Sequence, residues 1–280
     1  MPCEEGGDLN FPPLAKLGIA NAWDSLRKAE HEHMTRRMFN GLDNQDGPET
    51  DWGMRNMENP QWVLDAHNTK SGRVFMFGSG PSLFEQRPLL KLLKDEDTWT
   101  VNRFRKFRPP FIPTYHGVTE PGPIGGWGTY ILQLYDFPEA EQRIAVNWWP
   151  LDEAVEGWKW VPKAPDDIQV RWEGWFGLGD DLPPIPTAWA SPLTFGQLAC
   201  WFGYDELIYL GVDTTQEGQA WDPKQGRTMQ TRAIHSILEC AERGRMQMER
   251  AGRKIIDCTP GGRLNMEGAL PYVPLEEVLL

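Results

Sequence analysis

The sequence is poor in cysteine and has no motif that pairs one cysteine with another. Its four cysteines are scattered over 280 residues, at Cys3, Cys200, Cys240 and Cys258, and none stands in a Cys-x-x-Cys pair. This spacing argues against a structural zinc site and against a disulfide framework. Scattered, reduced cysteines are typical of the cytoplasm, where we expect the protein to be.

Long apolar runs and an excess of positive charge are also missing. No uncharged apolar stretch approaches the roughly 20 residues that span a bilayer, so we expect no transmembrane segment. Residues 1–5 do not resemble the start of a signal peptide. The net charge of −12 argues against nucleic acid as a partner, because phosphate contacts supply most of such affinity. One short basic run, which begins at Arg103, is either a solvated loop or a local anion site.

Three common cofactor or catalytic motifs do not occur. The sequence contains neither a Gly-x-Gly-x-x-Gly fingerprint nor a Gly-x-x-x-x-Gly-Lys-Ser/Thr loop. NAD binding and P-loop chemistry are therefore disfavoured. A Gly-x-Ser-x-Gly nucleophile elbow is also missing, which argues against a serine hydrolase.

The sequence does contain short apolar runs that alternate with helical segments. We expect strands over 74–77, 98–102, 111–118, 143–149, 168–172, 207–213 and 254–258, and helices over 89–94, 194–202 and 228–251. This alternation predicts an α/β fold with a doubly wound, mostly parallel Rossmann-type sheet. We expect this domain to cover residues 71–280, with a tryptophan-rich insertion at about 145–190, and residues 1–70 to form an N-terminal appendage of helix and loop.

Small and polar residues stand where the predicted strands end. Ligands of doubly wound sheets bind beyond the carboxyl ends of the strands, so these residues are expected to share one edge. The candidates for a nucleotide site are Gly78, Ser79, Gly80, Ser82, Asn102, Arg103, Asp213, Thr215, Thr259 and Gly261.

Several of these candidates also have an ordinary structural explanation. Gly78 and Gly80 allow a phosphate or ribose to approach the backbone, but a tight strand-to-helix turn also needs glycine. Ser82 either caps the following helix or touches a phosphate. Asn102 either binds a ligand or forms a local turn. Asp213 either holds Mg²⁺ or serves as an N-cap or loop carboxylate.

Tryptophan is abundant, with 14 residues, eight of them between Trp148 and Trp201. The indole ring offers a large stacking surface and one hydrogen-bond donor, which suits a sugar or a base. We expect the acceptor to lie near Trp148, Trp149, Trp175 and Trp221, and the alternative is ordinary packing under a long loop.

Taken together, these motifs resemble two related groups of transferases. One is the family 42 sialyltransferases, and the other is the MptE-like group, which includes archaeal 6-hydroxymethylpterin diphosphokinases. The resemblance rests on residues 77–83, 101–104, 113–115 and 194–213, and it covers about 73–120 and 190–270. Residues 256–264 are more similar to the MptE-like group. The resemblance implies a Rossmann-type fold with a mononucleotide donor.

The resemblance to the sialyltransferases also implies roles for residues of the donor site. Ser79 and Asn102 stand where that family has two asparagines that contact the nucleotide. Thr194 and Gly196 match a Thr-Ser-Gly segment near the cytidine and phosphates, with Phe195 in place of its serine.

The remaining matches concern the leaving phosphate and the base. Two tyrosines steady that phosphate in the family, and Thr215 and Trp221 stand in their positions. His235 lies at roughly the distance from the last strand that the family's catalytic histidine has, so the resemblance implies that it is the general base.

Three functions are open at this point. The first is a glycosyltransferase that moves a sugar from a CMP-sugar-like donor to a hydroxyl of a glycan or small-molecule acceptor. The second is an MptE-like diphosphokinase that uses ATP and a hydroxymethylpterin-like alcohol, with Mg²⁺ on Asp213. The third is a nucleotide-binding module without catalysis, which the replaced tyrosine pair favours. The oligomeric state is also open, a homo-oligomer included.

Overall fold

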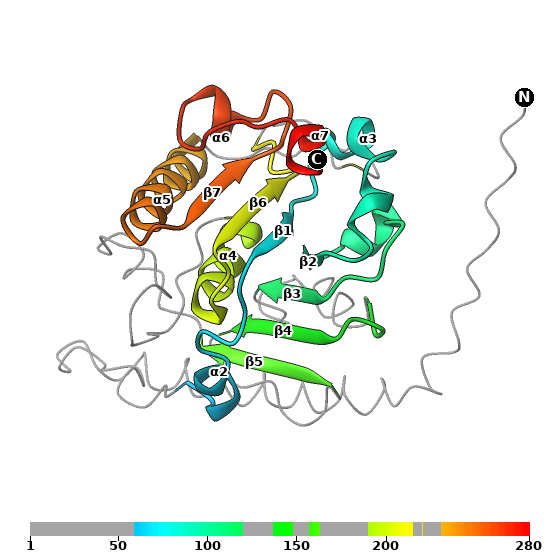
Figure 1. The fold of residues 1–280 in the computed structure, drawn as a ribbon, viewed down its shortest axis with the longest axis vertical. Coiled ribbons are helices and arrows are strands. Elements are labelled where there is room, and N and C mark those ends of the chain that lie inside the picture. Colours follow the sequence, from blue (N-terminus) through cyan, green and yellow to red (C-terminus); the bar gives the residue numbers. More distant parts are fainter. Residues whose placement is uncertain (1–58, 120–136, 148–156, 163–189, 215–219, 221–230) are drawn as a thin grey trace, which may run out of the picture. The chain divides into compact units, whose positions relative to one another are not determined.

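The fold is built around one parallel sheet of seven strands (Figure 1). The computed structural model describes residues 59–119, 137–147, 157–162, 190–214, 220 and 231–280. All neighbouring strands run parallel, in the order β5-β4-β3-β2-β1-β6-β7. The strands are β1 (Arg73–Phe77), β2 (Asp97–Val101), β3 (Tyr115–Thr119), β4 (Gln142–Asn147), β5 (Trp158–Pro162), β6 (Glu206–Leu210) and β7 (Lys254–Asp257). The predicted doubly wound, parallel Rossmann-type sheet is confirmed.

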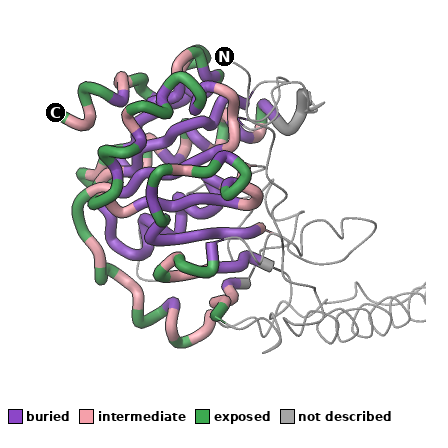
Figure 2. The backbone as a smooth tube through the Cα atoms, turned by 90° about the vertical axis from the view of Figure 1, so that its right-hand side faces the viewer, coloured by how far each residue is buried: buried purple, intermediate pink, exposed green. Residues whose placement is uncertain are grey.

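The central strands are apolar on both sides because helices or turns cover both faces of the sheet. In β1 and β6 every residue after the first is buried, and the two strands pair with Val74 opposite Leu207. Figure 2 shows this buried layer in purple, with exposed segments outside it. Strands that are buried on both faces read as continuous apolar runs, which is why these runs could be identified in the sequence.

One face of the sheet is covered by α2 (Gln61–Asp65), α4 (Ser191–Phe202) and α5 (Thr231–Arg250). The other is covered by α3 (Leu83–Gln86), the 3₁₀ helices η3 (Leu90–Leu93) and η4 (Phe104–Phe107), and α7 (Leu275–Val278). Side chains of β1 point alternately to the two faces. Val74 and Met76 pack on the face covered by α4 and α5, and Phe75 and Phe77 pack on the face covered by α3 and η3. A further short helix, α6 (Arg263–Met266), follows β7.

Residues 61–70, which the sequence assigns to the appendage, contact the end of α4. The indole nitrogen of Trp201 donates to Val63 O at 2.6 Å, and Lys70 N donates to Phe202 O at 2.7 Å. Val63 is fully buried, and the described residues belong to one compact unit. Within those residues, no helix combines the length and apolar character that crossing a bilayer requires.

Some predicted elements have different bounds in the structure. The helix expected over 89–94 is the 3₁₀ helix η3, preceded by the short α3, and Pro88 separates the two. The third strand begins at Tyr115 rather than at 111, and α4 begins at Ser191 rather than at 194. The edge strand β5 was not predicted. The strand expected over 168–172 lies outside the described residues.

Candidate functional site

The sheet changes direction of growth between β1 and β6. From β1 the chain adds β2 to β5 on one side, and β6 and β7 then pair on the other side of β1. In open α/β sheets such a topological switch opens a crevice beyond the carboxyl ends of the strands, where ligands bind. The turn at 78–82 follows β1 and the segment 211–214 follows β6, so both candidate segments flank this switch.

The two glycines of the first turn are required by its contact with the end of β6. A Cβ at Gly78 would overlap the carbonyl of Gly211, and a Cβ at Gly80 would overlap the Asp213 carboxylate. The same approach allows Gly80 N to donate to Gly211 O at 2.7 Å. Close packing of two strand ends therefore explains both glycines without a ligand.

Asp213 joins the two loops. Its Oδ1 accepts a hydrogen bond from Ser82 N at 3.1 Å, and its Oδ2 accepts one from Ser82 Oγ at 2.8 Å. The carboxylate of Asp213 therefore accepts from both the backbone N–H and the hydroxyl of Ser82, and the Ser82 side chain makes no capping hydrogen bond to α3.

The expected magnesium role of Asp213 finds little support in this geometry. Both carboxylate oxygens already accept hydrogen bonds from Ser82. The described residues hold no group of three His, Cys, Asp or Glu side chains that could bind a metal ion. The groups that contact the Asp213 carboxylate are hydrogen-bond donors of Ser82 and not further oxygen ligands for a cation. This arrangement fits a carboxylate that connects two loops better than it fits a Mg²⁺ ligand.

Asn102 lies at the end of β2 and connects three elements. Its backbone is left-handed, with φ 53°, and its Nδ2 donates to Ser191 Oγ at 2.9 Å. The same Ser191 hydroxyl lies 2.8 Å from Thr119 Oγ1 at the end of β3. The Asn102 Oδ1 atom is buried and has no hydrogen-bond partner among the described residues. A buried carbonyl without a donor is unusual and calls for an explanation.

Ser191 was not among the residues selected from the sequence. Its signal is the Ser191-Pro192 pair ahead of an apolar run, because proline in the first turn is typical of a helix start. The structure places Pro192 in the first turn of α4, which brings the Ser191 side chain to the edge of the sheet.

Thr194 and Gly196 lie inside α4, where the sequence predicts a helix. Both are buried, and Thr194 Oγ1 lies 3.3 Å from Ala190 O. Phe195 between them packs into the core, where its ring is 5.4 Å from that of Trp99. A Cβ on Gly117 of β3 would lie 2.5 Å from the Phe195 ring, so a glycine makes room for the aromatic side chain that replaces the family's serine.

The end of β7 forms a buried polar cluster beside the end of β6. Thr259 Oγ1 accepts from Val212 N at 3.2 Å, and Thr259 N donates to Asp257 Oδ1 at 3.0 Å. Asn265 Nδ2 donates to Asp257 Oδ2 at 2.8 Å. Burial raises the pKa of Asp257 to about 6, against the opposing effect of these hydrogen bonds. Thr259 is fully buried and Gly261 is exposed, so the cluster ties β6, β7 and α6 together.

The other candidates are dispersed or lie outside the described part of the chain. His235 is exposed in the second turn of α5 and makes no hydrogen bond or ion pair with another described residue. Arg103 is half-buried just before η4. The candidates Thr215, Trp148, Trp149, Trp175 and Trp221 lie outside the described residues.

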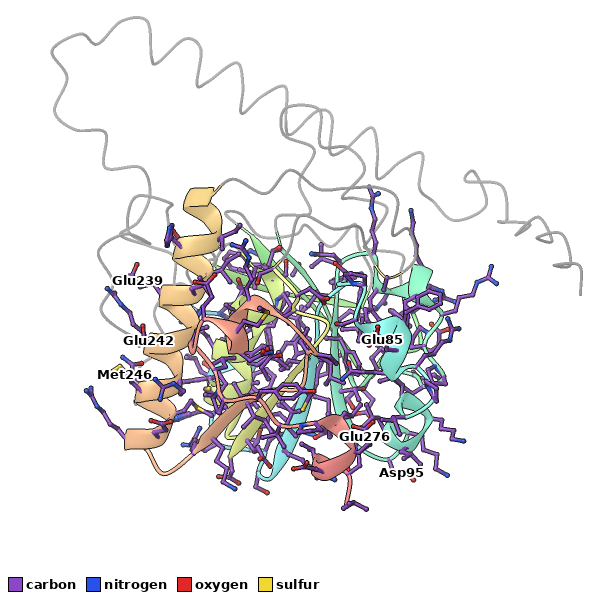
Figure 3. All side chains as sticks on the ribbon, turned by 90° about the horizontal axis from the view of Figure 1, so that it is seen from above. Glu85, Asp95, Glu239, Glu242, Met246 and Glu276 are labelled. Atoms are coloured by element: carbon purple, nitrogen blue, oxygen red, sulfur yellow. The ribbon has the colours of Figure 1, made fainter. Side chains whose placement is uncertain are left out.

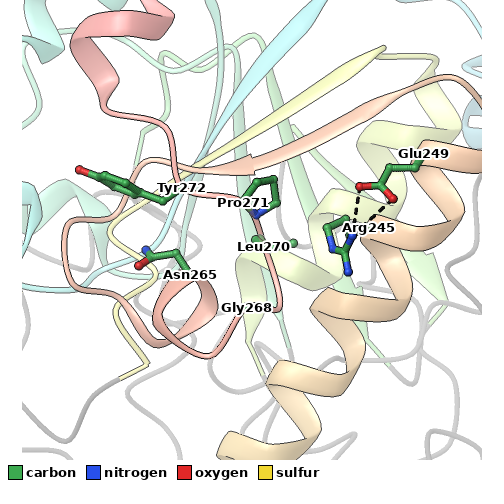
Figure 4. A pocket seen from close by; sticks show the side chains of 7 residues that line it. All are labelled: Arg245, Glu249, Asn265, Gly268, Leu270, Pro271 and Tyr272. Carbon is green, nitrogen blue, oxygen red and sulfur yellow. Dashed lines mark hydrogen bonds and ion pairs between the residues drawn. The ribbon is translucent and has the colours of Figure 1, made fainter.

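An open hollow of about 370 Å³ lies between α5, α6 and the segment after α6 (Figure 4). Tyr272 and Asn265 line one side of it. Arg245 lines the other, where its Nη1 is 3.1 Å from Glu249 Oε1. Arg245 Nε also donates to Ala269 O at 3.0 Å, so the charged groups of the hollow are engaged within the fold.

The fold of this chain is similar to those of several solved structures. No family model matches the sequence, and no curated protein is significantly similar to it. The sialyltransferase CST-II in complex with a trisaccharide acceptor and CMP is 14% identical, with a TM-score of 0.42 over 72% of this chain and 86% of that one. CstII from Campylobacter jejuni in complex with cytidine-5'-monophosphate is 14% identical, with a TM-score of 0.40 over 72% and 85%.

The MAf glycosyltransferase from Magnetospirillum magneticum AMB-1 is also similar. It is 15% identical, with a TM-score of 0.49 over 83% of this chain and 40% of that one. The present chain therefore spans less than half the length of that protein. At these identities the likeness concerns the fold and not the activity.

Proposed function

We propose that the protein is a glycosyltransferase that binds a nucleotide-activated sugar, of the CMP-sugar type, at the carboxyl ends of β1 and β2, beside the topological switch. The observation that carries this proposal is the Oδ1 atom of Asn102, at the end of β2, which is buried and has no hydrogen-bond partner among the described residues. Ser79, at the end of the neighbouring strand β1, is half-buried. Ser79 N and Ser79 Oγ make no hydrogen bond with another described residue, while Ser79 O accepts from Ala220 N at 2.9 Å.

These groups match the chemistry of a mononucleotide. The amide of Asn102 is oriented by Ser191, whose hydroxyl accepts one hydrogen of Nδ2, and the carbonyl oxygen is left to accept a hydrogen bond from a ligand. A carbonyl oxygen pairs with a hydroxyl or amine donor, such as a ribose hydroxyl or the amine of a base. The backbone N–H and hydroxyl of Ser79 are donors and suit a phosphate oxygen. Together the two residues offer an acceptor for the nucleoside and donors for its phosphate.

The reaction that follows is a displacement at the anomeric carbon of the donor. The acceptor hydroxyl attacks that carbon, the bond from carbon to phosphate oxygen breaks, and the nucleoside monophosphate leaves. The proton of the acceptor goes to a general base, for which His235 is the proposed residue. Acceptor binding by the tryptophan-rich stretch is part of the same proposal.

Ligand binding to Asn102→Ala and Asn68→Ala tests the donor site. Both asparagines have φ 53°, so alanine strains the backbone equally at the two positions, by about 1 kcal/mol or more. Asn68 forms hydrogen bonds with His67 and Arg253. It precedes β1, and Arg253 precedes β7, so these contacts lie at the starts of the strands and not at their carboxyl ends. We expect CMP to stabilise the wild type and Asn68→Ala in thermal unfolding, and to bind Asn102→Ala about fivefold more weakly, since one hydrogen bond contributes about 1 kcal/mol.

The same screen separates the other functions. Binding of CMP and release of CMP from CMP-sugars support the proposal. Binding of ATP only with Mg²⁺, with release of AMP in the presence of a hydroxymethyl heterocycle, would replace it with the diphosphokinase. Binding without turnover of any donor would leave a nucleotide-binding module. No response to any cytidine or uridine nucleotide would refute the proposal.

A further inference from the structure

The outer surface of α3, η3 and η4 carries a cluster of positive charge that the crevice does not use. Exposed cations on it include Arg87, Lys91, Lys106 and Arg108, none of which forms an ion pair with another described residue. Glu85 is an exposed acid on the same side, and Asp95 lies 3.7 Å from Lys94 (Figure 3). Excess positive charge here contrasts with the net charge of −12 for the whole chain.

Contacts between the segments hold the end of α3 against the end of η4. Arg87 Nη2 donates to Arg108 O at 3.3 Å, which joins the end of α3 to the end of η4. The Arg87 guanidinium lies 5.1 Å from the centre of the Phe107 ring. Phe107 and Leu90 belong to the buried layer below, so α3, η3 and η4 share one core and present their remaining side chains outward.

Exposed apolar side chains stand among the cations. Phe84 is 58% exposed, Leu92 is 53% exposed and Ile112 is 62% exposed. Single exposed apolar residues are ordinary, but these three belong to the same stretch, 84–112, as four exposed cations that form no ion pair among the described residues. We name the surface made by these seven residues the basic face. Apolar side chains beside lysine and arginine are typical of surfaces that lie on a lipid bilayer.

We propose that the basic face binds the surface of an anionic lipid bilayer. The cations pair with lipid phosphates and carboxylates, and Phe84, Leu92 and Ile112 enter the boundary between headgroups and acyl chains. A soluble polyanion would satisfy the cations but would leave the three apolar side chains in water, so the lipid surface accounts for more of the face.

The basic face also borders the crevice. The helix α3 begins directly after Ser82, and η4 begins two residues after Asn102. A molecule bound through this face would hold the ends of β1 and β2 close to the lipid surface. Lipid binding itself does not depend on which donor the crevice takes, so it can fail or succeed independently of the proposed transferase activity.

Co-sedimentation of the full chain with vesicles tests the proposal. One set of vesicles contains phosphatidylcholine alone, and the other contains about one-third phosphatidylserine. We expect binding to the second set only, weakened by added salt. Lys91→Gln/Lys106→Gln should lower the partition coefficient by about 25-fold, at roughly fivefold for each charge. Phe84→Ser should lower it by about tenfold, because a partly buried phenyl group leaves the interface.

Matched controls lie elsewhere on the surface. Lys254→Gln removes an exposed cation at the start of β7, and Met266→Gln removes an apolar side chain that is 72% exposed on α6. Both should bind vesicles like the wild type. The proposal is overturned if phosphatidylserine vesicles do not bind. A second combination of results also overturns it: heparin binds as tightly as phosphatidylserine vesicles do, and Phe84→Ser leaves vesicle binding unchanged. The basic face would then recognise negative charge alone.

Discussion

Replacing Gly80 with alanine tests whether the turn after β1 is shaped by its contact with the end of β6. The new Cβ would overlap the Asp213 carboxylate and lie 2.8 Å from Gly211 O. If the carboxylate moves away, it loses both hydrogen bonds from Ser82. Hydrogen bonds to a charged group contribute about 1.5 to 3 kcal/mol each, and crowding against Gly211 costs about 1 to 3 kcal/mol. We expect Gly80→Ala to lower the free energy of unfolding by about 4 kcal/mol.

A double-mutant cycle makes this prediction specific. Unfolding in urea can be followed by tryptophan fluorescence, because Trp99 and Trp201 are buried in the core. Asp213→Ala removes the overlapping group and its two hydrogen bonds, so Gly80→Ala should cost about 3 kcal/mol less in that background than in the wild type. Gly78→Ala is the matched control, since its Cβ would overlap a backbone carbonyl that Asp213→Ala leaves in place. Additive losses for Gly80→Ala and Asp213→Ala would refute the packing explanation.

Three further predictions concern the core and the chemistry. Burial raises the pKa of Asp257 from 3.8 to about 6, so the folded protein holds this proton more tightly than the unfolded chain. From about pH 4 to pH 7 the wild type should lose up to about 3 kcal/mol relative to Asp257→Asn in urea midpoints, and parallel pH profiles would contradict this. Gly117→Ala should destabilise by about 2 kcal/mol through its contact with Phe195, with a smaller loss beside Phe195→Leu in the same assay. His235→Gln should lower kcat by about 10²-fold or more with unchanged CMP affinity if His235 is the base, and an unchanged kcat would exclude that role.

The central strands could be predicted from the sequence because both of their faces are buried. β1 and β6 appear there as continuous apolar runs after their first residue. The start of β3 was placed too early because Phe111 is apolar, yet Phe111 packs into the core from a loop and Pro113 has no N–H for strand pairing. β5 was missed because its two tryptophans suggested a ligand surface, whereas Trp158 and Trp160 are half-buried at the edge of the sheet.

The candidate site could be predicted only in part, because its contacts join distant residues. The bond between Ser82 and Asp213 spans 131 residues and that between Asn102 and Ser191 spans 89. Local sequence identifies each residue as the end of a strand or the start of a helix. Which residues then meet depends on the order of strands in the sheet, and that order places the end of β1 against the end of β6.

A glycine-rich turn after the first strand is often interpreted as room for a phosphate. In this protein a side chain at Gly78 or Gly80 would overlap the segment that follows β6, so both glycines are required whether or not a ligand binds. Their presence therefore says little about the ligand, and specificity must come from polar groups that the packing does not use. Ser79 and Asn102 have such groups. A different polar side chain at position 79 would change the ligand contacts without disturbing the turn. Under the proposed function we therefore expect Ser79 to contribute to the choice of donor, and Ser79→Asn should change the relative affinities for nucleotides while the free energy of unfolding stays close to that of the wild type.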